Sequence, residues 1–133
     1  EVPFEVVDTL FRSSASGVDD RRRAVIRTDE EWTSAWAELV GHVAPTPAVP
    51  DVDFDAHFVV LATMGTRPSG GFLVDVGQLS HASDTLRAVV HETSPGAGCA
   101  NTLALPHPAI VIRVPQVAEN VAFVEVSTAT NCS

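Results

Sequence analysis

The residues best suited to chemistry lie in one short polar segment, TMGTRPSGGF at 63–72, which follows an apolar run. Its arginine and serine could contact a partner, while its proline and paired glycines are typical of a turn. The segment is therefore either a polar connection between strands or the binding surface of the protein. The binding-loop candidates in it are Thr66, Arg67, Pro68, Ser69, Gly70 and Gly71.

The same segment lacks the spacing that known catalytic loops require. A serine-hydrolase elbow needs GxSxG followed by a helix, but Ser69 stands in TRPSGG and no helix is expected after it. A phosphate-binding loop of the P-loop type needs a lysine and a helix start, and all eight cations of this chain are arginine. We therefore predict no catalytic residue and expect that the protein is not an enzyme.

Histidines and carboxylates are the other groups that could hold a metal ion. The five histidines are His42, His57, His81, His91 and His107. No pair has the HExxH spacing, but His91 and His107 could become neighbours in the fold, with Glu92 nearby. The alternating acids of 51–55 lack the glycine and the distal glutamate of a calcium loop. We expect no metal site and no cofactor.

Two cysteines, Cys99 and Cys132, form an even count that suits one disulfide. Cys132 lies beside the C-terminus and Cys99 lies in a Pro/Gly loop, so a bridge would fix the C-terminal tail. In the chain-entropy model a loop of this size contributes roughly 3–4 kcal/mol. A disulfide implies an oxidising compartment, and free thiols are the alternative. A catalytic Cys99 would need a histidine base that no pattern marks.

The charge balance excludes one class of partner. The chain has a formal net charge of −9, and an acidic domain does not neutralise the phosphates of nucleic acid. The one basic cluster, Arg21–Arg23, follows two aspartates. We interpret it as a solvated turn of mixed charge, with a basic patch for a partner as the alternative. No apolar run approaches the roughly 18 residues of a transmembrane segment.

The clearest element that positions these residues is a helix. Thr28 and Glu31 have the spacing of a capping box, and Gly41 stands where a left-handed stop belongs. Apolar residues recur between them at helical intervals, at Trp32, Ala35, Trp36, Leu39 and Val40. We predict an amphipathic helix over Asp29–Val40, with both tryptophans in the core.

Strand patterns account for most of the remaining chain. Apolar or alternating runs predict strands at 2–11, 23–27, 58–64, 72–76, 86–92, 109–114 and 121–126. The run at 58–64 is apolar throughout, as in a strand buried on both faces. Short connections favour antiparallel pairing. We predict a single domain over 1–133 with an α+β fold. About seven strands form a mainly antiparallel sandwich or partial barrel, and one amphipathic helix packs on it.

Several of these segments resemble the motifs of a known family, in the same order. The EW…W pattern at 31–36 resembles its helix motif, and VDF at 52–54 resembles its vDF motif. Residues 65–72 resemble its G.(K/R)P(T/S)GGY turn, and 95–96 and Pro106 match its later Pg and tPY positions. On these motifs the chain resembles the C-terminal domain of the PrcB-type protease-complex subunit, over nearly its whole length.

The resemblance implies an exported bacterial protein, often a lipoprotein, whose founding type is a non-catalytic subunit of a surface subtilisin-like protease. Two tyrosines of the family are replaced in this chain, by Phe72 and His107. A function that depends on those tyrosine hydroxyls is therefore not expected here. The turn at 65–72 is also similar to a loop of chagasin-type cysteine-protease inhibitors, but the helix does not fit that fold.

We therefore expect an exported, non-catalytic interaction domain whose partner is a protein, such as an exported protease or an envelope component. Nucleic acid is not an expected partner. The opening EVPFEVV has no basic region of a signal peptide, so a leader or a lipid-anchored segment would have been removed before it. A loop-based protease inhibitor is the alternative function. A small hydrolase or metal enzyme is less favoured.

Overall fold

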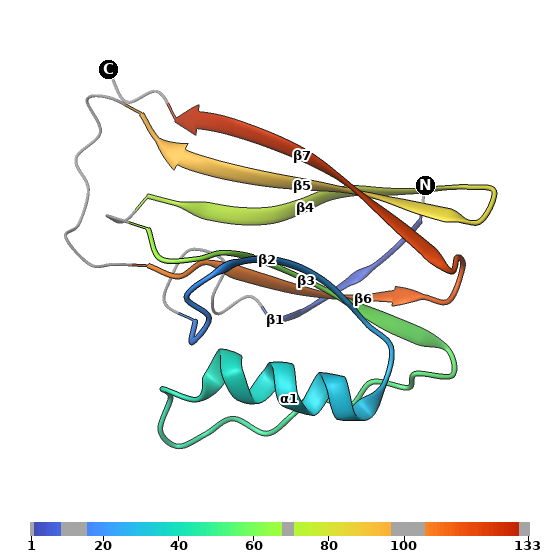
Figure 1. The fold of residues 1–133 in the computed structure, drawn as a ribbon, viewed down its shortest axis with the longest axis horizontal. Coiled ribbons are helices and arrows are strands. Elements are labelled where there is room, and N and C mark those ends of the chain that lie inside the picture. The colour runs from blue at the N-terminus through green and yellow to red at the C-terminus, as the bar shows by residue number, and fades with distance from the viewer. Residues whose placement is uncertain (1, 9–15, 68–70, 97–105, 131–133) are drawn as a thin grey trace.

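Three layers of secondary structure stack on one another in the computed structural model, which describes residues 2–8, 16–67, 71–96 and 106–130. A three-stranded sheet faces a four-stranded sheet, and the helix covers the other face of the four-stranded sheet (Figure 1). One hydrophobic cluster fills each of the two gaps between layers. The predicted α+β fold is confirmed, and the two separate sheets make it a sandwich rather than a partial barrel.

The described residues form one helix and seven strands. In chain order these are β1 (Glu5–Asp8), β2 (Arg21–Ile26), α1 (Asp29–Val40), β3 (His57–Met64), β4 (Leu73–Ala82), β5 (Thr85–Pro95), β6 (Ala109–Pro115) and β7 (Asn120–Thr130). The four-stranded sheet has the order β1-β6-β3-β2, and the smaller sheet has the order β4-β5-β7. Within the described ranges, the structure contains no helix long and apolar enough to cross a membrane.

The helix α1 has the bounds that the sequence predicted. The Oγ1 of Thr28 accepts a hydrogen bond from the N–H of Glu31 at 3.2 Å, a cap that typically stabilises a helix by about 1 kcal/mol. The Glu31 carboxylate accepts from the N–H of Arg27 at 3.3 Å, one residue before the position that the usual capping box reaches. These two bonds fix where the chain leaves β2 and enters the helix.

Both tryptophans of α1 lie in the core, as predicted. Trp32 and Trp36 are 1% and 4% exposed. Each indole N–H donates to a carbonyl of the proline-rich loop, Trp32 to Pro50 O at 2.8 Å and Trp36 to Pro47 O at 3.1 Å. A buried indole N–H needs an acceptor. These two hydrogen bonds therefore hold the proline-rich loop against the helix.

The strand β3 is buried on both faces because it lies in the middle layer. Phe58 and Val60 pack in the cluster between the sheets, while Val59 and Leu61 pack against the helix. None of the four side chains is more than 1% exposed. The sequence prediction of a central strand buried on both sides is confirmed.

The end of the helix differs from the prediction. Gly41 has φ −61° and ψ −20°, so it remains right-handed and is not a left-handed stop. The glycine is needed for space instead, because a Cβ there would lie 2.9 Å from the carbonyl oxygen of Ala37. The chain then turns, with the Val43 N–H donating to Val40 O at 2.9 Å.

One strand pair contradicts the expected antiparallel pairing. The strands β5 and β7 run parallel, from Thr85 opposite Asn120 to Pro95 opposite Thr130. The strand between them in sequence, β6, belongs to the other sheet. The chain therefore crosses to that sheet and returns in its original direction. Short connections impose antiparallel pairing only when consecutive strands lie in the same sheet.

Several strands differ in length from the sequence prediction. β1 is confined to Glu5–Asp8 within the described part of 2–11, and β2 begins at Arg21 rather than at residue 23. Three strands extend past their predicted ends, to Ala82, Pro95 and Thr130. These extensions are mostly polar, so the hydrophobic alternation stops before the hydrogen-bonded ladder does.

Candidate functional site

The candidate binding loop, residues 65–72, follows β3 and begins with a glycine. No other residue could replace this glycine without backbone strain. Gly65 has φ +73°, a conformation that glycine adopts without steric cost. A Cβ at this position would lie 3.0 Å from both the backbone nitrogen of Arg21 and the carbonyl oxygen of Asp19. The chain therefore passes directly against the segment that precedes β2.

Two backbone hydrogen bonds hold the next residues of the loop. The Thr66 N–H donates to the carbonyl oxygen of Asp19 at 3.2 Å, and the Arg67 N–H donates to the carbonyl oxygen of Pro106 at 2.9 Å. The acceptors belong to segments that are distant in sequence on either side. The base of the loop is thus anchored to the chain before β2 and to the chain before β6.

The Arg67 side chain folds back onto its own loop. Its guanidinium carbon lies 5.7 Å from the centre of the Phe72 ring, a cation–π contact worth roughly 0.5–1 kcal/mol. Its Nε donates to Thr66 O at 3.1 Å. Gly71 has φ 93°, which confirms the expected turn conformation at this glycine. The other three candidates lie outside the described residues and stay untested, namely Pro68, Ser69 and Gly70.

His107 joins the two segments that anchor the loop. Its Nε2 lies 3.3 Å from Asp19 Oδ1, and its carbonyl oxygen accepts the Ser16 N–H at 3.1 Å. Its Nδ1 is buried and has no hydrogen-bond partner in the described part of the chain. Asp19 therefore touches the candidate loop with its carbonyl group and His107 with its carboxylate.

Four charged residues bridge the two sheets next to this loop. Arg23 Nη2 lies 2.6 Å from Glu92 Oε2 and 2.8 Å from Glu125 Oε1. Arg21 contacts the same glutamates at 2.9 and 3.2 Å. Both arginines lie on one face of β2, and the glutamates belong to β5 and β7. The interpretation of Arg21–Arg23 as a solvated turn is therefore wrong, because this segment is a strand that faces a second sheet.

The pKa shifts in this cluster show that both partners stay charged. Burial alone would raise the pKa of Glu92, but hydrogen bonds from Arg23 and Arg21 outweigh it and keep this pKa below 4.5. Burial would likewise lower the pKa of Arg23, yet its hydrogen bonds to Glu125 and Glu92 raise it. The cluster therefore joins the sheets by charge and does not offer a proton donor at neutral pH.

Arg22 points to the opposite side of β2, toward the helix. Its Nη2 lies 2.8 Å from Asp20 Oδ1, and its Nη1 lies 3.1 Å from Glu38 Oε1 on α1. The hydrogen bond from Arg22 lowers the pKa of Asp20. All three arginines of the segment are thus paired within the chain, which argues against the alternative of a basic patch kept for a partner.

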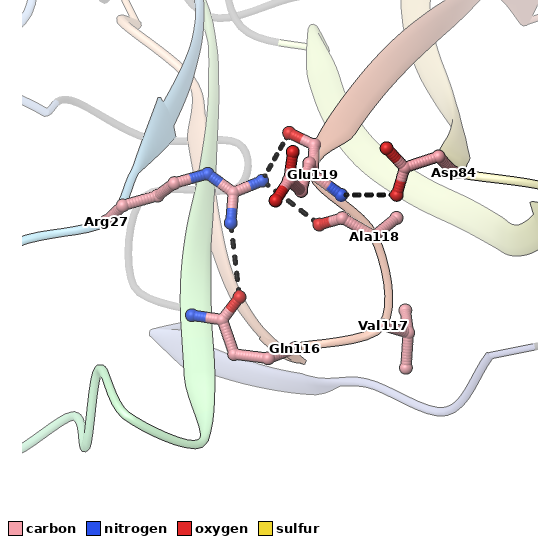
Figure 2. A pocket seen from close by; sticks show the side chains of 6 residues that line it. All are labelled: Arg27, Asp84, Gln116, Val117, Ala118 and Glu119. Carbon is pink, nitrogen blue, oxygen red and sulfur yellow. Dashed lines mark hydrogen bonds between the residues drawn. The ribbon is translucent and has the colours of Figure 1, made fainter.

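A hollow of about 580 Å³ lies at the other end of the sandwich and is lined by Arg27, Asp84, Gln116, Val117, Ala118 and Glu119. Figure 2 shows Arg27 reaching toward the β6–β7 turn, where its guanidinium donates to Gln116 Oε1 at 3.1 Å and to Glu119 O at 2.9 Å. The same guanidinium lies 4.4 Å from the centre of the Phe58 ring. Arg27 therefore holds this turn in place and is not a free ligand-binding group.

The residues weighed as zinc ligands do not converge. His91 and Glu92 are consecutive on β5, so they point to opposite faces of the sheet. Glu92 points between the sheets, where the arginines lie. His107 lies in the segment before β6 and contacts Asp19. Within the described ranges, no group of three or more histidine, cysteine or acidic side chains is placed to hold a metal ion.

Asp53 shapes the turn that leads into β3. Its carboxylate accepts the Asp55 N–H at 3.0 Å, and its carbonyl oxygen accepts the His57 N–H at 2.9 Å. Val52 and Phe54 beside it pack against the cluster under the helix. Turn formation and packing therefore account for this acidic segment better than calcium binding does.

The candidate loop lies within a segment that matches a known family model. Residues 58–115 match the family model described as PrcB C-terminal. This segment, which is less than half of the chain, is therefore similar to the PrcB C-terminal family. The family resemblance predicted from the motifs is thereby confirmed over residues 58–115. The PrcB C-terminal segment runs from β3 to the end of β6 and contains the loop, whereas the motifs at 31–36 and 52–54 lie outside it. Neither the curated proteins nor the solved structures gave a match.

Sequence reasoning missed the residues that hold the loop. Asp19 and Pro106 act through backbone carbonyls, and a backbone contact leaves no side-chain pattern. Arg21 and Arg23 did carry a signal, because residues two apart share one face of a strand. The predicted disulfide partners both lie outside the described residues, at Cys99 and Cys132.

Proposed function

We propose that this protein is an exported, non-catalytic interaction domain that acts as an accessory subunit of a secreted or surface protease complex. It binds its partner through the β3–β4 loop, residues 65–72. The observation that carries the proposal is the PrcB C-terminal match, which spans both strands that flank this loop. The resemblance seen in the sequence associates this family with a protease subunit that is not itself catalytic.

The geometry of the loop supports a binding role. Loops on a rigid scaffold are common recognition elements, and a loop whose base is already ordered loses less conformational entropy on binding. Gly65 fixes the exit from β3, and the N–H groups of Thr66 and Arg67 are bonded to other segments. Thr66 is exposed and Arg67 is partly exposed, so both can contact a partner without disturbing the core.

The arrangement of β5 and β7 supports export. Pro95 and Thr130 are partners at the end of this parallel pair. The chain continues from them toward Cys99 and Cys132, respectively. A disulfide between these cysteines would form only in an oxidising compartment, such as the periplasm or the cell exterior.

The test is capture of the partner from exported proteins of the source organism. The tagged full chain should retain a protease or an envelope protein, and Thr66→Ala with Arg67→Ala should reduce the amount retained by at least about tenfold, a loss of roughly 1.4 kcal/mol. Arg87→Ala, on the exposed outer face of β5, is the matched control. Equal capture by the loop variant and the parent chain would exclude the loop as the contact.

A second function fits the same anchored loop, namely that of a protease inhibitor. An inhibitory loop also needs a rigid base, which the bonds from Thr66 to Asp19 and from Arg67 to Pro106 provide. Titration against papain-like and subtilisin-like proteases separates the two functions. Inhibition at micromolar concentration that Arg67→Ala abolishes would favour the inhibitor, and a captured protease that remains active would favour the accessory subunit.

A further inference from the structure

In the part of the chain that the structure describes, the smaller sheet ends in a long strand with one side unpaired. β7 has 11 residues and lies at the edge of the order β4-β5-β7, as Figure 1 shows for the strand drawn in red. An edge strand presents a row of free N–H and C=O groups that can pair with another strand. Natural proteins usually block such edges with bulges, charges or proline.

The other three sheet edges are short, interrupted or charged. β1 has 4 residues and a register shift between Val6 and Asp8. β2 has 6 residues and begins with three arginines. β4 has a register shift between Val76 and Gln78, and its Leu79 carbonyl already accepts the N–H of Val2 at 2.9 Å.

The free edge of β7 has none of these features. Its pairing with β5 continues without a register shift over its whole length, and its sequence NVAFVEVSTAT contains no proline and no cation. Its one charged residue is Glu125, and this carboxylate is bound by Arg21 and Arg23. The edge is therefore long, regular and free of uncompensated charge.

The direction of each backbone group on β7 follows from one hydrogen bond. The Asn120 N–H donates to the carbonyl oxygen of Asp84, directly before β5, at 3.2 Å. Because these directions alternate along a strand, even-numbered residues bond toward β5. The groups of the odd-numbered residues point to the free edge, at Val121, Phe123, Glu125, Ser127 and Ala129.

We propose that this edge pairs antiparallel with β7 of a second copy of the chain, about a twofold axis that passes beside Val124. In this register the odd-numbered residues exchange hydrogen bonds, with Phe123 of each copy opposite Glu125 of the other. On the outer face Val124 lies opposite Val124, and Ala122 lies opposite Val126. The register joins the apolar outer residues of both copies and keeps the two Glu125 carboxylates from facing each other.

The strength of this contact is limited by its size and by charge. A single pair of strands makes an interface at the small end of the specific range, below about 1,200 Å², so the dimer dissociates on dilution. Each copy carries a net charge of −9, and the resulting repulsion weakens as salt screens it. Dimerisation should therefore increase both with protein concentration and with salt.

Sedimentation of the full chain over a wide concentration range tests the proposal. The parent should form a dimer at high concentration, and Val124→Lys should weaken the dimerisation constant by at least about tenfold. Ser127→Pro should do the same because it removes a free-edge N–H without removing a bond to β5, whereas Ser127→Ala keeps this group and should dimerise like the parent. Far-UV circular dichroism confirms that the variants are folded.

A second variant separates edge pairing from stacking of the outer sheet faces. Val89 on β5 is the neighbour of Val124 on the same face but lies one strand away from the edge. Val89→Lys should leave an edge-paired dimer largely intact and would disrupt a stacked one. A chain that stays monomeric at every concentration, or a dimer insensitive to both Val124→Lys and Ser127→Pro, would overturn the proposal.

Hydrogen exchange followed by NMR gives a readout residue by residue. In the dimer the N–H groups of Phe123 and Glu125 should exchange more slowly than in dilute monomer, while those of Ala122 and Val124 should be protected in both because they already bond to β5. Uniform protection changes along β7, with no alternation between odd and even residues, would contradict strand pairing.

Discussion

Arg23 on β2 and Glu125 on β7 form an ion pair across the two sheets, with Arg23 Nη2 2.8 Å from Glu125 Oε1. Both residues lie on edge strands, but of different sheets. The same guanidinium also contacts Glu92 on β5 and donates from Nη1 to the carbonyl oxygen of Thr63 on β3 at 2.9 Å. One arginine of β2 therefore contacts three further strands, β3, β5 and β7.

Removing this arginine should destabilise the domain. The side chains of Arg23 and Glu92 are only 11% and 15% exposed, so Arg23→Met would leave Glu92 close to Glu125 with Arg21 alone to balance them. We expect a loss of about 2–4 kcal/mol in the free energy of unfolding, because removing one member of a buried ion pair leaves the charge of the other uncompensated. Urea unfolding measures this loss directly.

The matched control for this change is Arg87→Met. Arg87 is exposed on the outer face of β5, and a surface substitution of this kind should change stability by less than about 0.5 kcal/mol. Equal losses of stability in the two variants would show that the ion pairs of Arg23 with Glu92 and Glu125 contribute nothing beyond one positive charge on the protein.

Stability should fall at acid pH because of Glu92. Its pKa is held below its ordinary value of 4.5 in the folded protein, so below about pH 5 the unfolded state binds the proton first and gains relative stability as the pH falls. The stability that ionised Glu92 contributes is fully present above about pH 5. It is lost as the pH falls through the pKa of Glu92 in the folded protein. Unfolding curves between pH 7 and pH 2 should show the decline.

The variant Glu92→Gln should be less stable at neutral pH and should lose less stability on acidification. Glu119→Gln, at an exposed position in the β6–β7 turn, serves as the comparison and should retain the slope of the parent protein. An unchanged acid slope in Glu92→Gln would mean that other carboxylates carry the pH dependence.

Gly65→Ala should strain the base of the candidate loop. The φ of +73° costs a residue with a Cβ roughly 1–2 kcal/mol, and the new Cβ would meet the backbone of Asp19 and Arg21 at 3.0 Å. We expect a loss of about 2–3 kcal/mol in stability, together with chemical-shift changes around Pro106. Thr66→Ala keeps the anchoring N–H and should leave both stability and shifts nearly unchanged.

Cys99 and Cys132 should form a disulfide in the exported protein. The register of β5 and β7 pairs Pro95 with Thr130, and each cysteine follows one of these residues closely in sequence. Intact mass spectrometry without reductant should show the chain two hydrogens lighter than after reduction. Free thiols at both positions would remove the main support for an oxidising compartment.

The helix and its buried face could be predicted because their signals are local. The capping pair Thr28 and Glu31 and the spacing of Trp32, Trp36 and Leu39 act within a few turns of one helix, so they are complete in a short stretch of sequence. The apolar run of β3 likewise predicted a strand covered on both sides. The order of the family motifs added the PrcB C-terminal assignment, which the match over 58–115 supports.

The site depended on contacts that no short stretch contains. Arg23 meets Glu125 across a sequence separation of 102 residues, and the loop is held by carbonyl groups of Asp19 and Pro106, whose side-chain types do not mark that role.

By itself, then, the sequence determined the helix, most strands and the resemblance of residues 58–115 to the PrcB C-terminal family, because periodicity, capping and short motifs are local properties. Only the tertiary structure decided that β7 returns parallel to β5. It also decided that two arginines, Arg21 and Arg23, join the two sheets, and that the polar segment TMGTRPSGGF begins as an anchored loop. These depend on which distant segments lie side by side, and that is fixed by how the two sheets and the helix pack around their shared cores.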